Sequence, residues 1–204
     1  MGRVSDAKER LVEAVQELIW TGSYGSTTID KICEKAGVKK GSFYHFFDSK
    51  ADVAAAYLER ETEQKRPLWD GMFSPAVPPL ERLKRLCDHV YQHQVEIRAR
   101  HGKVLGCPLF CLGSEVCTQE SQLQRKIQEI FARWRVYLES AVRDAHAAGL
   151  VHAPDAAVAA QVIFAYQEGM MTQARIQNDL EVLRGMYAGC LQILGAANAE
   201  RLAA

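Results

Sequence analysis

Four consecutive residues, Lys39-Lys40-Gly41-Ser42, combine side chains that suit contact with a nucleic acid. Two ammonium groups and a hydroxyl can donate hydrogen bonds to phosphate oxygens and to the acceptor edge of guanine. The glycine beside them leaves room for a close approach of the backbone. The alternative is an ordinary pair of solvated lysines, and the flanking sequence decides between the two.

That flanking sequence predicts two short helices joined by a tight turn, the first from Thr27 and the second from near Lys39. Thr27 and Asp30 have the spacing of a capping box, with Asp in place of the usual Glu or Gln. Between the helices stands Ala36-Gly37-Val38, where small residues and a glycine capable of positive φ allow a close crossing. This pattern is typical of a helix-turn-helix, whose second helix enters the major groove of DNA.

Other side chains around this motif are candidates for phosphate contact. Tyr44 and His45 can donate from a hydroxyl and a ring N–H, and Lys50 begins the next predicted helix, whose N-terminus favours an anion. The predicted DNA-binding residues are Thr27, Thr28, Lys39, Lys40, Gly41, Ser42, Tyr44, His45 and Lys50. We expect the aromatic residues Phe43, Phe46 and Phe47 to form the core of the small domain instead.

The composition limits the class of protein. Hydrophobic residues make up 48% and charged residues 25% of 204 residues, which is ordinary globular usage. Lys and Arg number 25, as do Asp and Glu, so the chain does not coat nucleic acid, although a local basic face is compatible with this balance. No apolar run reaches the ~18 residues of a membrane helix. Met1 to Glu9 is polar, so we expect no secretion signal, no membrane partner and a cytoplasmic location.

Apolar residues recur at helical spacing along nearly the whole chain, which predicts an all-α fold of about nine helices. Ser5 is the expected cap of the first helix, Gly22 its end, and the fourth helix is expected to run from Ser49 to about Lys65. Prolines and glycines between residues 67 and 79 give the one clear composition break, where we place a linker. Later helices are expected to begin near Leu80, Leu109, Leu123, Pro154 and Leu180, the last ending at Leu194.

The run from Thr27 to Lys50 resembles the signature of the TetR/AcrR family, roughly T-x-x-x-I-A-x-x-A-G-V-S-x-G-x-x-Y-x-x-F-x-x-K. The resemblance covers about a quarter of the chain. Cys33 stands where Ala is usual, a small buried replacement. Lys39 stands where Ser is frequent, which bears on the operator that is read and not on the fold.

The resemblance implies a transcriptional regulator with two domains. Residues 1–50 would form a three-helix DNA-binding domain, and residues 51–204 a helical effector-binding and dimerisation domain. Its partners would be a palindromic double-stranded DNA operator, a small-molecule effector and a second copy of the chain, with no cofactor. Repression relieved by the effector is the usual mode in this family.

The last two predicted helices are apolar on more than one side, which exceeds the ~100° stripe that a surface helix needs. We expect them to pair with their copies in a symmetric homodimer. The predicted interface residues are Val158, Val162, Tyr166, Leu183, Tyr187, Leu191 and Leu194. The alternative is a pair of helices buried within one subunit.

The helices between these elements and the DNA-binding domain would enclose the effector pocket. Its candidate wall residues are Tyr91, Cys107, Phe110, Cys111, Phe131, Trp134, Tyr137, Phe164 and Gln167. Small-ligand pockets are mostly apolar with few polar groups, which this set matches. Each aromatic residue at helical spacing is also compatible with ordinary core packing.

Cys107 is the most unusual of six cysteines, because it precedes a predicted helix whose dipole favours a thiolate. Cys111 follows one turn later, and His101 and Lys103 could add positive potential. The segment resembles a G-C-x-L-x-x-L-x-x-E stretch of one TetR branch, some of whose members respond to electrophiles through that cysteine. Two alternatives stay open: small buried core thiols, or a metal site with Cys117, which the C-x-x-x-C spacing fits poorly.

An enzyme is the main rival class. A helical thiol oxidoreductase could use Cys107 and Cys111, but their spacing is not C-x-x-C. The sequence also has no Ser-His-Asp arrangement, Gly-rich phosphate loop or H-E-x-x-H motif. We therefore expect a regulator without enzymatic activity and without a bound metal.

Overall fold

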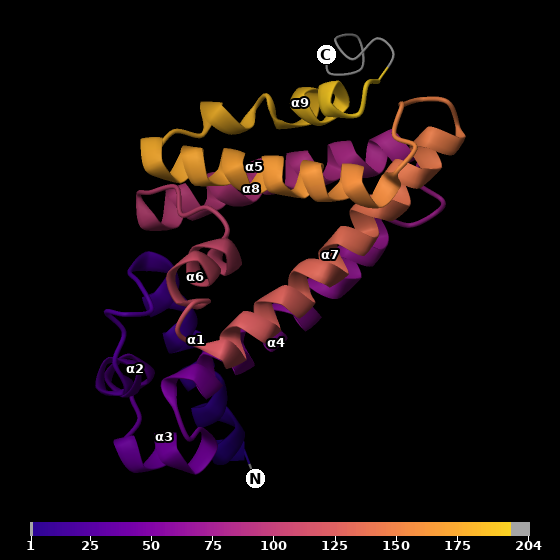
Figure 1. Ribbon diagram of the computed structural model, residues 1–204. Helices are drawn as coiled ribbons and strands as arrows, with labels where there is room; N and C mark the ends of the chain where they lie inside the picture. The colour runs from indigo at the N-terminus through magenta and orange to yellow at the C-terminus, as the bar shows by residue number, and fades with distance from the viewer. Residues whose placement is uncertain (1, 197–204) are drawn as a thin grey trace. The chain divides into compact units, whose positions relative to one another are not determined.

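The computed structural model describes residues 2–196, and of residues 2–5 only the backbone. Within this range the chain is all-α, as expected, and contains no strand (Figure 1). Its elements are α1 Gly2–Thr21, α2 Ile29–Ala36, α3 Lys40–Phe46, α4 Lys50–Met72, α5 Pro79–His101, α6 Pro108–Val116, α7 Ser121–Ala147, α8 Ala156–Gln177, the 3₁₀ helix η1 Glu181–Leu183 and α9 Met186–Ile193.

Local sequence explains most helix starts. Pro79 and Pro108 each occupy the first position of a helix, where a missing N–H costs nothing. Asp155 caps α8 by accepting the N–H of Val158 at 3.0 Å. Ser5 lies inside α1 and not before it, so its expected capping role is wrong.

The fourth helix is longer than predicted. α4 continues through Pro67 to Met72, although proline removes one backbone donor from a helix interior. The additional turns of α4 bring Trp69 against α7, where its ring stacks on Trp134 with centroids 5.5 Å apart. Phe73, just after α4, contacts Tyr137 of α7. This aromatic packing offsets the cost of the proline, so the linker predicted from residue 67 is in fact mostly helix.

The ninth predicted helix is broken. η1 and α9 are separate, with Arg184 and Gly185 between them. The Asp179 carboxylate accepts the Glu181 N–H at 3.0 Å and starts the short 3₁₀ helix. Gly185 then precedes α9 with no side chain to cap it. A continuous apolar pattern cannot reveal this break, because both pieces bury apolar residues.

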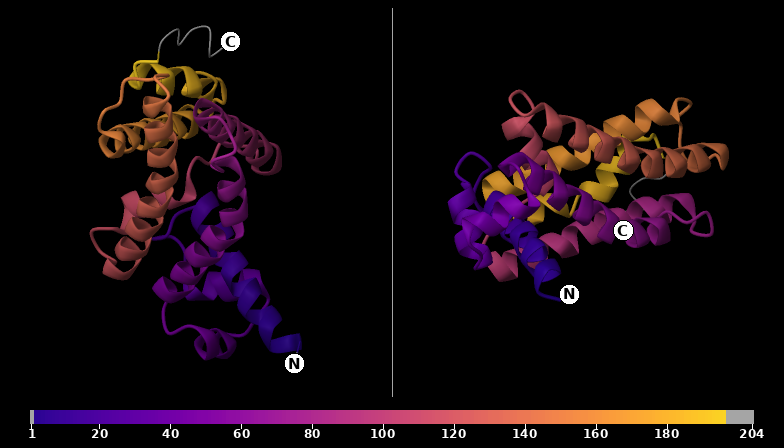
Figure 2. Two further views of the ribbon diagram at one scale, coloured as in Figure 1. Left: turned by 90° about the vertical axis from the view of Figure 1, so that its right-hand side faces the viewer. Right: turned by 90° about the horizontal axis from the view of Figure 1, so that it is seen from below.

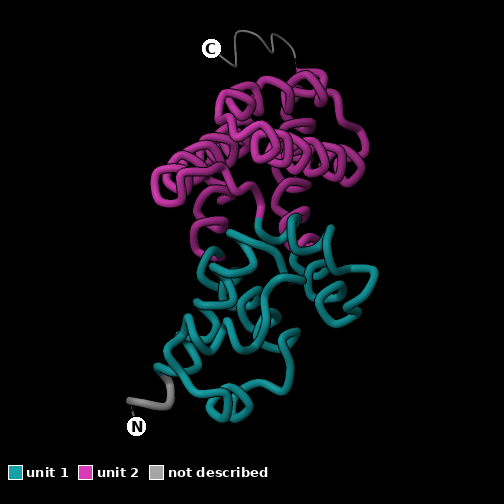
Figure 3. Tube along the Cα trace, turned by 90° about the vertical axis from the view of Figure 1, so that its left-hand side faces the viewer, with its two compact units in different colours: residues 1–65, 108–130 teal, residues 66–107, 131–204 magenta. Residues whose placement is uncertain are grey.

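The described chain divides into two compact units (Figure 3). Unit 1 contains residues up to Lys65 together with residues 108–130, and unit 2 contains residues 66–107 and 131 onwards. The bounds between units therefore fall inside α4 and α7 and just before α6. The predicted division at residue 50 concerns function and stays a prediction.

Each unit has its own core. In unit 1, α1 packs against α2 and α3 (Figures 1 and 2). Leu11, Ile32 and Phe43, one from each of these helices, have no exposed surface. Burying a phenylalanine ring of this kind contributes about 2–3 kcal/mol. In unit 2, α9 lies along α8 and α5, and Cys190 and Leu191 are completely buried there. Each core is thus sufficient to position the side chains of its own unit.

Candidate nucleic-acid interface and effector site

The start of α2 is fixed by Thr28. Its hydroxyl accepts the N–H of Lys31 at 3.2 Å, which satisfies one of the free donors of the first turn. The capping box predicted from Thr27 is therefore displaced by one residue. Thr27 is 2% exposed and donates to the carbonyl of Ser23 at 2.7 Å, so its hydroxyl faces the protein and not the surface.

The turn between α2 and α3 depends on Gly37, as the sequence predicts. Gly37 has φ 63° and ψ 37°, a left-handed conformation that other residues adopt only with strain. Its N–H and that of Val38 return to the carbonyls of the last turn of α2. A residue with a side chain here would be strained, which explains the glycine.

The two faces of α3 differ in character. Phe43 points into the core with no exposed surface, and its ring contacts Tyr44 and Phe47 at centroid distances of 5.4 and 5.9 Å. Lys39, Lys40, Gly41, Tyr44 and His45 are exposed, and Ser42 is half-exposed. A Cβ built on Gly41 meets no atom within 4 Å, so this part of the helix faces open space. The structure thus leaves these six of the nine predicted contacts at least half-exposed, in α3 and at the residue just before it.

Lys40 already has a partner. Its Nζ lies 2.8 Å from Oδ1 of Asp30 in α2, and this exposed ion pair raises the pKa of the lysine. A phosphate at this position would compete with Asp30 for the ammonium group. Exposed pairs contribute little to stability, so the competition would cost little.

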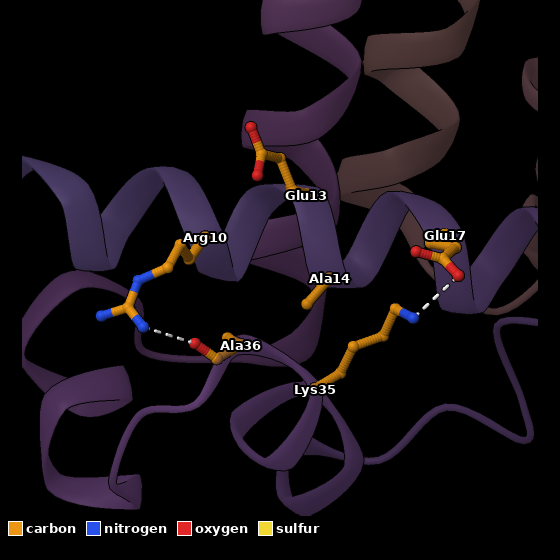
Figure 4. A pocket seen from close by; sticks show the side chains of 6 residues that line it. All are labelled: Arg10, Glu13, Ala14, Glu17, Lys35 and Ala36. Atoms are coloured by element: carbon orange, nitrogen blue, oxygen red, sulfur yellow. Dashed lines mark hydrogen bonds and ion pairs between the residues drawn. The ribbon is translucent and has the colours of Figure 1, made fainter.

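Two contacts from α1 hold the turn in place (Figure 4). The Arg10 guanidinium donates to the carbonyl of Ala36 at 2.9 Å, and Lys35 Nζ lies 2.8 Å from the carboxylate of Glu17. These contacts lie along the sides of a shallow groove between α1 and α2. They fix α2 against α1 and so determine how α3 is presented.

Lys50 faces inward. Its Nζ donates to the carbonyl of Tyr24 at 2.8 Å and lies 3.9 Å from the centre of the Tyr24 ring. Partial burial lowers the pKa of Lys50. Its predicted phosphate contact stays a prediction, but in this structure Lys50 anchors the loop between α1 and α2.

Glu115, in α6, holds the same loop; it is the final Glu of the G-C-x-L-x-x-L-x-x-E stretch, whose pattern does not indicate this contact. Its two carboxylate oxygens accept the N–H groups of Tyr24 and Gly25 at 2.9 and 2.7 Å. The Tyr24 hydroxyl donates to Glu120, and burial with this negative neighbour raises the pKa of Tyr24. The contact spans about ninety residues of sequence, so only the fold could reveal it.

In unit 2, four of the predicted pocket residues form one aromatic cluster. Phe131 lies 5.0 Å from Phe164 and 5.8 Å from Trp134 between ring centroids. Trp69 of α4 and Phe73 just after it complete the cluster and contact Tyr137, the fourth predicted member. The sequence does not point to Trp69 and Phe73, because they lie in the stretch where the prolines and glycines predict a linker.

Cys107 lies against α8. Gly106 has φ 67°, and a Cβ there would lie 3.3 Å from the Met171 carbonyl, so this glycine allows the close approach. Buried Gln94 in α5 exchanges two hydrogen bonds with the backbone of Gly106, at 3.0 and 3.2 Å. Cys107 is 8% exposed, and its thiol hydrogen-bonds to the buried carboxyl group of Glu168.

This environment differs from the predicted one. His101 and Lys103 are exposed, and the group that the fold brings to the thiol is an acid. Within residues 2–196 no three His, Cys, Asp or Glu side chains gather as metal ligands, so the metal alternative has no support.

The other predicted pocket residues are dispersed. Gln167 is 4% exposed, and its amide donates to the thiols of Cys87 and Cys190 at 3.7 and 3.8 Å. Tyr91 stacks with the guanidinium of Arg184 at 5.2 Å. Phe110 and Cys111 are half-buried in α6, in unit 1. A pocket role for these residues stays a prediction.

Comparison with known proteins now decides the family. Residues 8–57 match the description "Bacterial regulatory proteins, tetR family", and residues 79–189 match "Tetracyclin repressor-like, C-terminal domain". The chain belongs to the TetR family. It is therefore a DNA-binding transcriptional regulator with a small-molecule effector, and nothing in these matches supports the oxidoreductase alternative.

Individual relatives agree along most of the chain. Transcriptional regulator AcuR of Cereibacter sphaeroides is 31% identical over 84% of this chain and 77% of its own. The repressor NemR of Escherichia coli is 26% identical over 93% of this chain and 94% of its own. A crystal structure of regulatory protein TetR from Rhodobacter sphaeroides has 27% identity and a TM-score of 0.79, covering 92% of this chain and 98% of that one.

A crystal structure of the reduced form of E. coli NemR superposes with a TM-score of 0.79 and 22% sequence identity. The match covers 95% of this TetR-family chain and 99% of that chain. That likeness shows the fold. No helix among the described residues is long and apolar enough to cross a membrane.

The predicted dimer residues of this TetR-family chain fall into two groups. Val158 and Val162 of α8 are 58% and 47% exposed. Leu183, Leu191 and Leu194 are at most 2% exposed. Within one chain they are core residues, which agrees with the alternative that these helices are buried within one subunit. Tyr166 and Tyr187 are half-buried. Ile176 and Val136, at 78% and 65% exposed, are further apolar surface residues that the sequence pattern does not single out.

Proposed function

We propose that this regulator is a homodimeric repressor, that its α3 reads a palindromic operator, and that a thiol-reactive small molecule releases it. The observation that carries the DNA-reading part is the exposed start of α3. There Lys39, Lys40 and Gly41 are exposed, while the Phe43 side chain is completely buried. Donors at the N-terminal end of a recognition helix meet base edges and phosphates in the major groove.

The dimer part rests on exposed apolar side chains of α8. Val158 and Val162 are one helical turn apart, and Val136 of α7 and Ile176 are also exposed. Val136 and Val158 line the same surface groove, and exposed apolar patches are typical of protein–protein interfaces. A two-fold dimer presents two copies of α3, which a palindromic operator requires at a spacing of ~34–36 Å.

The effector part rests on Cys107 and on relatives. Its thiol is reduced and hydrogen-bonded to a buried acid, unlike an ordinary core thiol. NemR of Escherichia coli is 26% identical to this chain, and a crystal structure of NemR shows its reduced form. We carry this over to Cys107 and propose small electrophiles or oxidants as the effector class, with no cofactor.

Cys107 and the DNA-binding helices can be coupled through α6. Cys107 directly precedes Pro108, the first residue of α6, and Glu115 in α6 holds the backbone of Tyr24 and Gly25. A change in the position of α6 would alter the hold on that loop, which precedes α2 and α3. An effector that favours the altered state would therefore lower operator affinity by linkage. Such a repressor acts on chromosomal DNA, so we place it in the cytoplasm.

The test is an electrophoretic mobility shift with DNA from upstream of the protein's own gene, supplemented by a random-site selection. The untreated protein is expected to bind, and a thiol-reactive electrophile to release it. Cys107→Ser is expected to bind without being released, while Cys117→Ser, a half-buried thiol of unit 1, serves as the matched control. Failure to bind any selected site would contradict the DNA-binding part, and release that persists in Cys107→Ser would contradict the thiol part.

A further inference from the structure

Glu168 is an unexpected residue in the core of unit 2. It lies in the middle of α8, is 3% exposed, and is more deeply buried than most charged side chains in proteins. Its Oε2 atom has no hydrogen-bond partner among the described residues. Burial raises the pKa of Glu168 to about 7, while the hydrogen bond from the Cys107 thiol lowers it. A buried carboxyl group without full pairing is costly, and packing alone would favour an apolar residue or an amide.

The neighbouring position on the same helix shows the usual solution. Gln167 is equally buried but neutral, and its amide contacts the thiols of Cys87 and Cys190. Contact with Cys190 and burial raise the pKa of the Cys87 thiol, which keeps it protonated and inert. Two adjacent residues of α8 therefore face two thiol environments, and only the one at Cys107 contains a group that can take up a proton.

We propose that Glu168 is the proton acceptor that activates Cys107 toward small, neutral electrophiles. This inference rests on the proposed function, because it specifies how the effector reacts there. Glu168 and Cys107 are in direct hydrogen-bond contact, so no rearrangement is needed for proton transfer. A neutral electrophile is expected because an anionic one would place a second negative charge beside a buried carboxylate.

With a conjugate acceptor such as methyl vinyl ketone, the reaction is a conjugate addition. A sulfur electron pair of Cys107 attacks the β-carbon of the electrophile, a C–S bond forms, and the electrons of the C=C bond move toward the carbonyl oxygen. The S–H bond breaks as its proton passes to the carboxylate of Glu168. That proton then adds to the α-carbon, directly or relayed through a water molecule, and the carboxylate is restored. The sum is addition of S–H across the double bond, with no oxidant or reductant.

The groups around the pair allow this role. On α8, the Arg175 guanidinium lies two turns beyond Glu168 and donates to the carbonyl of Leu105 at 3.1 Å. On α5, the side chain that holds the Cys107 segment is neutral Gln94. Glu168 is the ionisable side chain that the structure places in hydrogen-bond contact with the Cys107 thiol.

The experiment measures alkylation of the full-length protein by methyl vinyl ketone, without DNA, from about pH 5 to pH 9. Peptide mass mapping gives the rate at Cys107 and, as an internal reference, at Cys117. The variants are Glu168→Gln and the matched control Glu96→Gln, an exposed glutamate of α5. In the parent protein the rate at Cys107 should rise through about pH 7, where Glu168 ionises, and then level off.

In Glu168→Gln the rate at Cys107 should fall at least ~10-fold at neutral pH and follow ionisation of an ordinary thiol near pH ~8.5. Glu96→Gln should match the parent protein, and Cys117 should react equally in all three. An unchanged rate and pH profile in Glu168→Gln would overturn the inference. If that variant does not fold, the pH profile of the parent protein is the test. An alkylation rate at Cys107 that rises only near pH ~8.5 would contradict a role for Glu168.

The failures of the two proposals are distinguishable. Operator binding by the untreated parent protein tests the proposed function and does not involve Glu168. In one outcome the parent protein binds its operator and is released by the electrophile, while Cys107 reacts at the same rate in Glu168→Gln as in the parent protein. That result would support the proposed function and contradict the role of Glu168.

Discussion

The side chains assigned to DNA in unit 1 lie at the surface, whereas the polar side chains assigned to the effector in unit 2 are buried. Lys39, just before α3, and Lys40 and His45 within it are exposed. Gln94 and Glu168 are at most 3% exposed and are held by contacts from other elements. An exposed charge costs the free protein little, whereas a buried one costs stability and needs a reason in function.

The comparison separates two kinds of expected mutational effect. Changes on the exposed face of α3 should alter operator affinity and leave the free energy of unfolding nearly unchanged. Changes at buried polar groups of unit 2 should alter stability, its pH dependence or the response to effector.

The largest effect is expected from disrupting the proposed dimer face. Val162→Asp places a charge on an exposed apolar position, where it would be buried only in a dimer. We expect monomers in light scattering and a loss of operator affinity of at least ~100-fold, because the two reading heads would no longer bind as one unit. Leu68→Asp, at an exposed position of α4, is the control. A dimeric Val162→Asp with normal affinity would place the interface elsewhere.

The next effect concerns Glu168 and stability. The carboxyl group ionises near pH 4.5 in the unfolded chain and at about pH 7 when folded. Between these values the folded protein keeps a proton that the unfolded chain has lost, so the free energy of unfolding falls as pH rises. Above pH 7 the carboxyl group is ionised in both states, and the full loss of stability caused by burying its charge is present. This cost is about 3 kcal/mol at about 1.4 kcal/mol per pH unit.

Glu168→Gln removes this cost. In urea unfolding we expect the variant to be more stable than the parent protein at pH 8, by up to about 3 kcal/mol, and similar to it near pH 4.5. Glu96→Gln should show no such difference. Equal stability of parent and Glu168→Gln at both pH values would mean that the folded carboxyl group is not held protonated.

A smaller effect is expected at Gly41. Its Cβ position is empty in the free protein, so Gly41→Ala should fold normally and gain up to about 1 kcal/mol from helix propensity. If DNA approaches this backbone, the methyl group should weaken operator binding ~10-fold, which corresponds to about 1.4 kcal/mol. Gly71→Ala in α4 is the matched control, since its Cβ position is also empty. Equal operator affinity of both variants would indicate that DNA does not approach Gly41.

These contrasts also explain what can be predicted from the sequence. The helix-turn-helix is predictable because its determinants are local: Gly37 at the turn, Phe43 in the core and Lys40 at the start of α3. The break at Gly185 and the extension of α4 through Pro67 are not, because tertiary packing decides them. The contact of Glu115 with the loop before α2 and the Glu168–Cys107 pair connect residues far apart in sequence, so no local pattern encodes them.

The most direct test of DNA reading by α3 compares two lysines with nearly the same local environment. Lys40 and Lys84 are both exposed, and each lies 2.8 Å from an aspartate, Asp30 and Asp88 respectively. Operator affinity is measured against salt concentration for Lys40→Ala and Lys84→Ala. We expect Lys40→Ala to bind ~5–10-fold more weakly at low salt and to reduce the salt slope by about 1 for each phosphate that is no longer neutralised, while Lys84→Ala matches the parent protein. Identical binding by the two variants would contradict the assignment of α3 as the element that reads DNA.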